Sequence, residues 1–176
     1  FADVENATKS KNTKLDQTAI AIVKANENGW WVADIIHGRW DIKKTAKKIF
    51  DAVEHYRPVA VGIEKGALKN AVLPYLTDIM KSSQRFFRVE ELTHGNKKKT
   101  DRVVWALQGR FEHGQITLNE GAWNSQFLDE LFQFPNALVH DDLVDALAYI
   151  DQLAKVSYYY DYEEDDFEVL DPVAGY

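Results

Sequence analysis

Three carboxylates lie close together in one short segment, residues 140–151, which reads HDDLVDALAYID. If this segment is helical, with about 100° between successive residues, then Asp141, Asp142 and Asp145 fall within about 100° of one another. The apolar residues of the segment fall on the opposite side. The dipole of a helix stabilises anions in its first turn, which explains Asp141 and Asp142 as ordinary structural residues but leaves Asp145 unexplained. Since like charges at this spacing repel each other, the cluster indicates a site that needs cations.

Two further acids end or border predicted strands far from this segment. Glu64 comes directly after residues 59–63, VAVGI, a short apolar run that is typical of a strand buried on both faces. In α/β proteins the carboxyl ends of such strands border the crevice that holds the site. Asp3 lies in or beside a predicted first strand. Either acid alone is equally well explained as a surface residue at the end of a strand, so the hypothesis depends on their convergence.

Acids that converge from distant segments stay ionised together only if cations compensate their charge. Ligands that are all oxygen atoms suit Mg²⁺ or Mn²⁺. Two such ions about 4 Å apart can hold a phosphate, activate a water and stabilise the departing oxygen. The sequence therefore predicts phosphodiester hydrolysis with two divalent cations, Mg²⁺ or Mn²⁺, as cofactors.

The remaining sequence predicts the strands and helices that must position these acids. Apolar runs and alternations predict strands at residues 18–24, 30–36, 59–63 and 85–92, with a short extended piece at 115–118. Apolar residues at helical spacing predict helices at residues 41–56, 66–81, 100–111, 124–133 and 140–154. Asn28 and Gly29 predict a hairpin turn, and Thr100 is a candidate helix cap. Together with the strand around Asp3, this order predicts an α/β fold with a mixed sheet of about five or more strands, the first three antiparallel, flanked by helices.

The chain has 176 residues, with 28 Asp and Glu against 21 Lys and Arg and a formal net charge of -7. Seven of the acids lie from Tyr158 onward, where there is no Lys or Arg, which leaves 21 acids for 21 bases in the rest of the chain. We therefore expect one domain at residues 1–157 and an acidic C-terminal tail at residues 158–176. The absence of cysteine excludes disulfides, thiolate zinc sites and cysteine nucleophiles. No stretch has the roughly 20 apolar residues that a membrane span needs, and no leader for secretion is visible, so we expect a cytoplasmic protein.

The densest basic patch flanks Thr100, at the predicted start of a helix. It comprises Lys97, Lys98, Lys99 and Arg102. Cations and unpaired backbone N–H groups at a helix start bind phosphates, so the patch predicts contacts with a DNA backbone, although a solvated surface loop has the same composition. No element for reading bases is evident, and we expect little sequence specificity. His140, just before the helical acids, either orients a carboxylate or contacts a metal, or it only caps the helix.

Four acid-bearing segments follow one another in a characteristic order. They are Asp3 in a strand, Asp16-Gln-Thr-Ala before a hydrophobic strand, Val-Gly-Ile-Glu64, and His140-Asp-Asp-Leu-Val-Asp-Ala-Leu-Ala, which is the most specific. This order resembles the nuclease domain of the large terminase subunit of tailed bacteriophages, and the resemblance extends to about Ala154. That domain is similar to the RuvC-type Holliday-junction resolvases and belongs to the RNase H-like superfamily. The resemblance implies an RNase H-like fold and metal-dependent endonuclease cleavage of double-stranded viral DNA during genome packaging.

The resemblance also assigns roles to single residues. Asp3, Glu64 and Asp142 match the family's metal-binding catalytic acids. Asp145 matches the second acid that the resolvases carry on the last helix. Asp141 would hold a metal through a water molecule, unless a shift of one residue exchanges its role with that of Asp142.

Whole terminases carry an ATPase domain before the nuclease. No G-x-x-x-x-G-K-[ST] motif occurs in this chain, so we expect an isolated nuclease domain without the motor. The resemblance implies double-stranded DNA, the N-terminal ATPase domain, the portal and the small terminase subunit as partners, in the host cytoplasm and without a membrane.

Two other interpretations stay open at this point. The first is another enzyme of the superfamily, a Holliday-junction resolvase or an RNase H-type nuclease. The second belongs to a different class and is a non-catalytic DNA-binding or assembly module, in which the acids would be structural.

Overall fold

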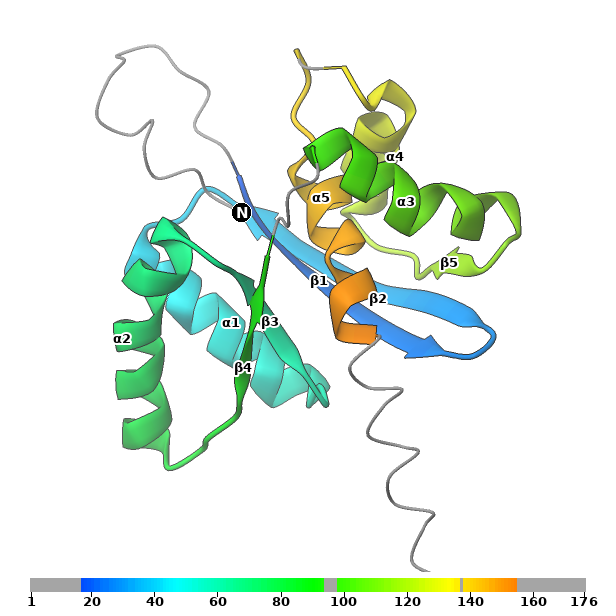
Figure 1. The fold of residues 1–176 in the computed structure, drawn as a ribbon. Coiled ribbons are helices and arrows are strands. Elements are labelled where there is room, and N and C mark those ends of the chain that lie inside the picture. The colour runs from blue at the N-terminus through cyan, green and yellow to red at the C-terminus, as the bar shows by residue number, and fades with distance from the viewer. Residues whose placement is uncertain (1–16, 94–97, 137, 155–176) are drawn as a thin grey trace, which may run out of the picture.

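A long β-hairpin forms the centre of the molecule, and helices pack on both sides of it (Figure 1). The structure is a computed structural model that describes residues 17–93, 98–136 and 138–154. Strand β1 (Thr18–Asn26) pairs antiparallel with β2 (Gly29–Gly38), and Thr18 lies opposite Gly38. The pairing predicted for these two strands is confirmed. The strand predicted around Asp3 lies outside the described residues.

The turn of the hairpin depends on Asn26 and Gly29. The Asn26 side chain accepts hydrogen bonds from the backbone N–H groups of Asn28, at 2.9 Å, and Gly29, at 3.2 Å. Gly29 has a φ of +144°, and a Cβ atom there would collide with the carbonyl oxygen of Gln115. Only glycine therefore fits where the hairpin approaches the backbone of Gln115.

The strands form two small sheets, one of which contains the hairpin. Strand β5 (Ile116–Leu118) pairs parallel with β2, giving the order β1-β2-β5. Strands β3 (Val61–Glu64) and β4 (Val89–Leu92) pair parallel with each other. The α/β class with mixed strand directions is confirmed, while in the described ranges the strands fall into two sheets.

Helices α1 (Ile42–Tyr56) and α2 (Ala67–Ser83) lie against β3 and β4. The Asp41 carboxylate caps α1 by accepting the Lys44 backbone N–H at 2.7 Å. Helix α1 ends where Arg57 adopts a left-handed conformation before Pro58, as its sequence predicts. Pro74 lies inside α2, which nevertheless forms one continuous helix of 17 residues.

Helices α3 (Lys99–Glu112), α4 (Asn124–Gln133) and α5 (Asp142–Ala148) cover the other side of the hairpin. Two predictions about these helices are wrong. Lys98 rather than Thr100 occupies the N-cap position of α3. The helix predicted at residues 140–154 begins at Asp142, and a turn at Tyr149 separates α5 from helical residues 150–154. The chain tightens there because the Gln152 N–H bonds the Tyr149 carbonyl, three residues back, at 3.1 Å.

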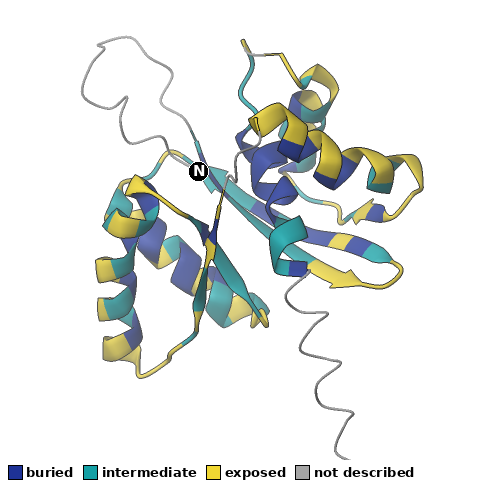
Figure 2. Cartoon of the chain, in the orientation of Figure 1, coloured by how far each residue is buried: buried dark blue, intermediate teal, exposed yellow. Residues whose placement is uncertain are grey.

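The apolar side chains form two cores, one on each side of the hairpin. The first joins β1, β2 and β5 to helices α3, α4 and α5, and the second joins α1, α2 and β3. Figure 2 shows the burial concentrated on the faces that these elements turn toward each other. Among the described residues, no helix is long and apolar enough to cross a membrane.

Candidate active site

Helix α5 holds its acids inside the molecule rather than on its surface. All seven of its residues are buried, Asp142 with 8% and Asp145 with 4% of its surface exposed. Asp141 precedes the helix with a φ of -134° and is partly exposed. Buried carboxylates need charge or hydrogen-bond partners, and the partners found here define the site.

Two cations of α3 neutralise the acids at either end of the first turn of α5. The Lys99 Nζ atom lies 2.7 Å from Asp141 Oδ1 and 3.3 Å from Asp145 Oδ2. The Arg102 guanidinium donates a short hydrogen bond to Asp145, and both side chains of that pair are buried. Burial alone would lower the pKa of Lys99, but the carboxylates of Asp145 and Asp141 together raise it, so Lys99 stays charged.

Glu64 reaches the same network from the end of β3. Its Oε1 atom accepts a hydrogen bond of 2.9 Å from the Tyr149 hydroxyl. The Arg102 guanidinium lies 4.2 Å from the centroid of the Tyr149 ring and thus connects this tyrosine to Asp145. Burial and the neighbouring Glu64 carboxylate raise the pKa of Tyr149, so its hydroxyl remains a donor at neutral pH. Glu64, Asp145 and Asp141 therefore belong to one contact network, although 77 residues or more separate Glu64 from the other two acids in the chain.

Asp142 faces the start of β1 instead. Its Oδ2 atom accepts the Gln17 backbone N–H at 3.1 Å and lies 3.7 Å from His140 Nδ1. The Gln17 side chain contacts His37 Nδ1 at 3.2 Å, so the ends of β1 and β2 and the start of α5 meet here. The placement of His140 fits its predicted role beside a carboxylate, which stays a prediction.

Comparison with known families decides which class of protein carries this network. Residues 7–152 match the family model of the terminase RNaseH-like domain. The chain belongs to this family. No curated protein matches it closely enough to count as a relative. This match confirms the predicted terminase family and its RNase H-like fold. The matched range of this terminase domain includes Glu64, Asp141, Asp142 and Asp145, while Asp3 precedes it.

One buried acid of the terminase domain was missed by the sequence-based prediction. Glu130 of α4 has 3% of its surface exposed and accepts the backbone N–H groups of Leu143 at 2.8 Å and Val144 at 3.4 Å. Those donors lack partners inside α5 because they belong to its first turn, so Glu130 caps α5 from a neighbouring helix. Burial raises the pKa of Glu130. The available signal was its position three residues after Phe127, on the predicted buried face of α4.

The candidate metal ligands of the terminase domain are all carboxylates, and carboxylate oxygens are ligands that Mg²⁺ and Mn²⁺ prefer. Within the described ranges, no three of the His, Asp and Glu side chains are grouped so that they would hold a metal ion. Asp145 is engaged by Arg102 and Lys99, while Glu64 accepts from the Tyr149 hydroxyl and Asp142 from the Gln17 N–H. Two predicted site residues, Asp3 and Lys97, lie outside the described residues.

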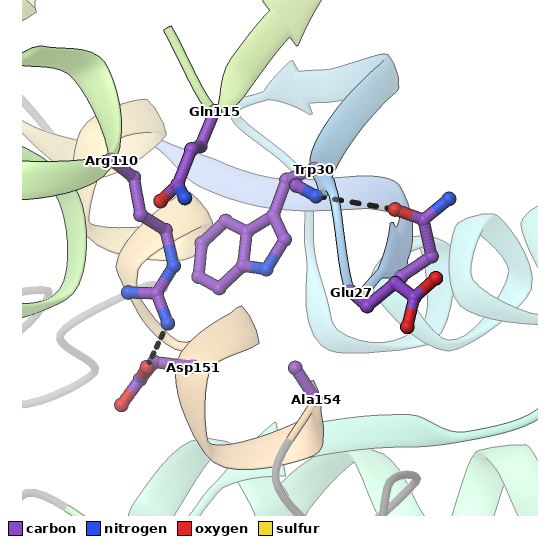
Figure 3. A pocket seen from close by; sticks show the side chains of 8 residues that line it. Glu27, Trp30, Arg110, Gln115, Asp151 and Ala154 are labelled. Atoms are coloured by element: carbon purple, nitrogen blue, oxygen red, sulfur yellow. Dashed lines mark hydrogen bonds and ion pairs between the residues drawn. The ribbon is translucent and has the colours of Figure 1, made fainter. Parts of the chain in front are cut away.

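A separate small pocket of about 170 Å³ lies at the far end of the hairpin (Figure 3). There the Arg110 guanidinium stacks 4.3 Å from the Trp30 ring centroid and pairs with Asp151 at 2.9 Å. Asn26, which lines this pocket, and Gln17 at the acids lie at opposite ends of β1, roughly 30 Å apart along an extended strand. The pocket is therefore not part of the acid site.

Proposed function

We propose that this terminase domain is a metal-dependent endonuclease that cleaves double-stranded viral DNA during genome packaging, by two-metal phosphodiester hydrolysis with little sequence specificity. The observation that supports this most is the contact network that joins Glu64, at the carboxyl end of β3, to Asp145 of α5. Membership in the terminase family adds that the expected substrate is DNA.

The metal ligands in this proposal come from three separate segments. Asp3, Glu64 and Asp142 are the direct catalytic ligands, and Asp145 or Asp141 completes the second site. When bound, Mg²⁺ or Mn²⁺ would neutralise phosphate charge and lower the pKa of an attacking water. Fixed carboxylates make such a site effective because their geometry is set before the substrate arrives.

Neighbouring side chains hold these ligands in place. The Tyr149 hydroxyl orients Glu64, and Glu130 fixes the first turn of α5. His140 and the Gln17 N–H both face Asp142 Oδ2. Each contact restricts a carboxylate to one orientation, which is the role expected of groups that support metal ligands.

The basic residues predicted at the start of α3 have two different roles in the proposal. The buried Arg102 side chain, with 9% of its surface exposed, compensates Asp145. Lys99 is 42% exposed and can exchange Asp141 for a phosphate oxygen, while Lys98 is exposed at the helix start. Lys97, Lys98 and Lys99 thus supply the phosphate contacts, and Arg102 contributes through Asp145. In the whole terminase this domain would act in the host cytoplasm with the ATPase domain, the portal and the small subunit.

A plasmid assay tests the proposal. Supercoiled plasmid is incubated with the protein and Mn²⁺, Mg²⁺ or EDTA. We expect nicking and linearisation with Mn²⁺, none with EDTA, and a loss of at least about 100-fold in Glu64→Gln and Asp142→Asn, since each removes a charged ligand. The matched control is Asp129→Asn, an exposed acid of α4, which should cleave like the wild type.

Intact plasmid under every metal condition would overturn the proposal and favour a non-catalytic DNA-binding or assembly module. The same assay with four-way junctions and RNA–DNA hybrids separates the related enzymes. Strong preference for either substrate over duplex DNA would point to a resolvase or an RNase H-type nuclease.

A further inference from the structure

A basic surface covers the first two turns of α1 and the residues just before it. We call it the α1 patch. Its members are Arg39, Lys43, Lys44, Lys47 and Lys48. All are exposed except Lys48, which is partly buried with its Nζ atom 5.7 Å from the centroid of the Trp40 ring.

The order of charges along α1 is the opposite of what helix stability favours. Four lysines occupy the first two turns, and Asp51 and Glu54 lie in the later turns. The dipole of a helix favours anions at its start and cations at its end. The Asp41 carboxylate caps the helix and offsets this only in part, because it is one negative charge against four lysines. The stability of α1 therefore does not account for Lys43 and Lys44, whereas an anionic partner does.

Two lysines of the α1 patch lack the ion pairs that several other basic side chains form. Lys65 and Lys69 pair with Glu91, and Arg88 pairs with Glu90. Lys47 pairs with Asp51 at 2.9 Å. In the part of the chain that the structure describes, the ammonium groups of Lys43 and Lys44 form no ion pair, so they remain available for an anion from outside.

The α1 patch lies at the end of the hairpin that holds Asp142. Gly38, the last residue of β2, pairs with Thr18, and the adjacent Gln17 donates its N–H to Asp142. Arg39 follows Gly38 directly, so the patch begins within a few residues of the acid site. Duplex DNA carries a phosphate about every 3.4 Å of axis on each strand, and a duplex held at the acids therefore extends its charge over the neighbouring surface.

We propose that the α1 patch binds the phosphate backbone of duplex DNA beside the candidate active site, with Lys43 and Lys44 as its principal contacts. The inference rests on the proposed function for its choice of partner. It adds a second, separate surface to the phosphate contacts assigned to the start of α3. Because the contacts are to phosphates, the patch increases affinity without selecting a base sequence.

The test measures DNA affinity against salt concentration. Anisotropy of a fluorescent duplex is recorded in EDTA for the wild-type chain, K43Q/K44Q, K43R/K44R and the control K24Q/K81Q. Lys24 and Lys81 are exposed and lie on β1 and α2, so the control removes the same charge elsewhere. We expect K43Q/K44Q to reduce the slope of log K against log salt by about 1 to 2, since each lost phosphate contact is worth about 0.9. K43R/K44R and K24Q/K81Q should keep the wild-type slope.

Each remaining outcome overturns the inference in a different way. A wild-type slope in K43Q/K44Q removes the α1 patch from DNA binding, while plasmid cleavage by the wild type would leave the proposed function intact. Absence of salt-dependent DNA binding in the wild type contradicts both. The variant K43Q/K44Q is also tested for binding to a polyglutamate peptide. If it binds DNA like the wild type but loses the peptide, the α1 patch contacts an acidic protein surface instead.

Discussion

At the scale of single residues, charge compensation determines what each acid can do. Asp145 lies between Arg102 and Lys99, Asp141 faces Lys99, and Glu64 accepts from the Tyr149 hydroxyl. A metal at Asp145 must compete with two cations. The pairing thus distinguishes Asp145 from the other acids, which spacing along the helix could not do.

The buried Arg102–Asp145 pair gives a prediction about stability. Arg102→Met should lower the free energy of unfolding by about 3 kcal/mol, because it leaves a buried carboxylate without its closest cation. Urea denaturation monitored by circular dichroism measures the change. The control is Arg88→Met, which breaks the exposed pair with Glu90 and should cost less than about 1 kcal/mol. Equal losses in the two variants would contradict the role given to Arg102.

The sequence marked out a set of charged residues as a candidate site but did not show how they pair. Asp141, Asp142 and Asp145 were identified from helical spacing and Glu64 from its position after an apolar strand. The sequence predicts phosphate contacts for the basic residues before and within α3. It cannot show whether such a cation faces a phosphate of DNA or a carboxylate of the protein, since cations attract both. Only the packing of α3 on α5 shows that Lys99 and Arg102 face acids more than 40 residues away.

At the scale of elements, hydrophobic periodicity predicted most helices and strands. The hairpin of β1 and β2 and the N-cap of α1 follow from local residues, Asn28-Gly29 and Asp41. The boundaries of α5 do not, because its ends are set by tertiary contacts. Glu130 satisfies its first turn from α4, and the Tyr149 hydroxyl is bound to Glu64 where the helix is interrupted. Neither partner is close in sequence to the helix end that it contacts.

Glu130 gives a prediction about the start of α5. Its pKa is raised by burial, so the folded state binds a proton more readily than the unfolded state, where the ordinary value is 4.5. The contribution of Glu130 to stability should therefore decrease as pH rises from about 4.5 through its raised pKa. Glu130→Gln cannot titrate, so the wild type should lose stability relative to this variant over that interval. Urea unfolding at a series of pH values measures the difference.

The control for Glu130→Gln is Asp129→Asn, which removes an exposed charge from the same helix. A stability difference between the wild type and Glu130→Gln that stays constant with pH would contradict the prediction. So would an equal pH-dependent change in Asp129→Asn.

At the scale of the whole molecule, the candidate site lies where the two hydrophobic cores meet. Ile63, next to Glu64, belongs to the core of α1, α2 and β3, while Leu143 and Val144 belong to the core on the other side of the hairpin. The Tyr149–Glu64 hydrogen bond joins the two sides. Such a boundary allows buried acids to converge without interrupting either core. The class of fold followed from the order of strands and helices, but this meeting of two cores depends on long-range packing that single-sequence patterns do not contain.

The most direct test of the account is a crystal structure of the chain grown with Mn²⁺, with anomalous diffraction used to locate the metal. The account predicts anomalous density within about 2.5 Å of carboxylate oxygens of both Glu64 and Asp142, since oxygen ligands bind divalent cations at such distances. Anomalous density confined to other surfaces, with none at Glu64 or Asp142, would contradict it.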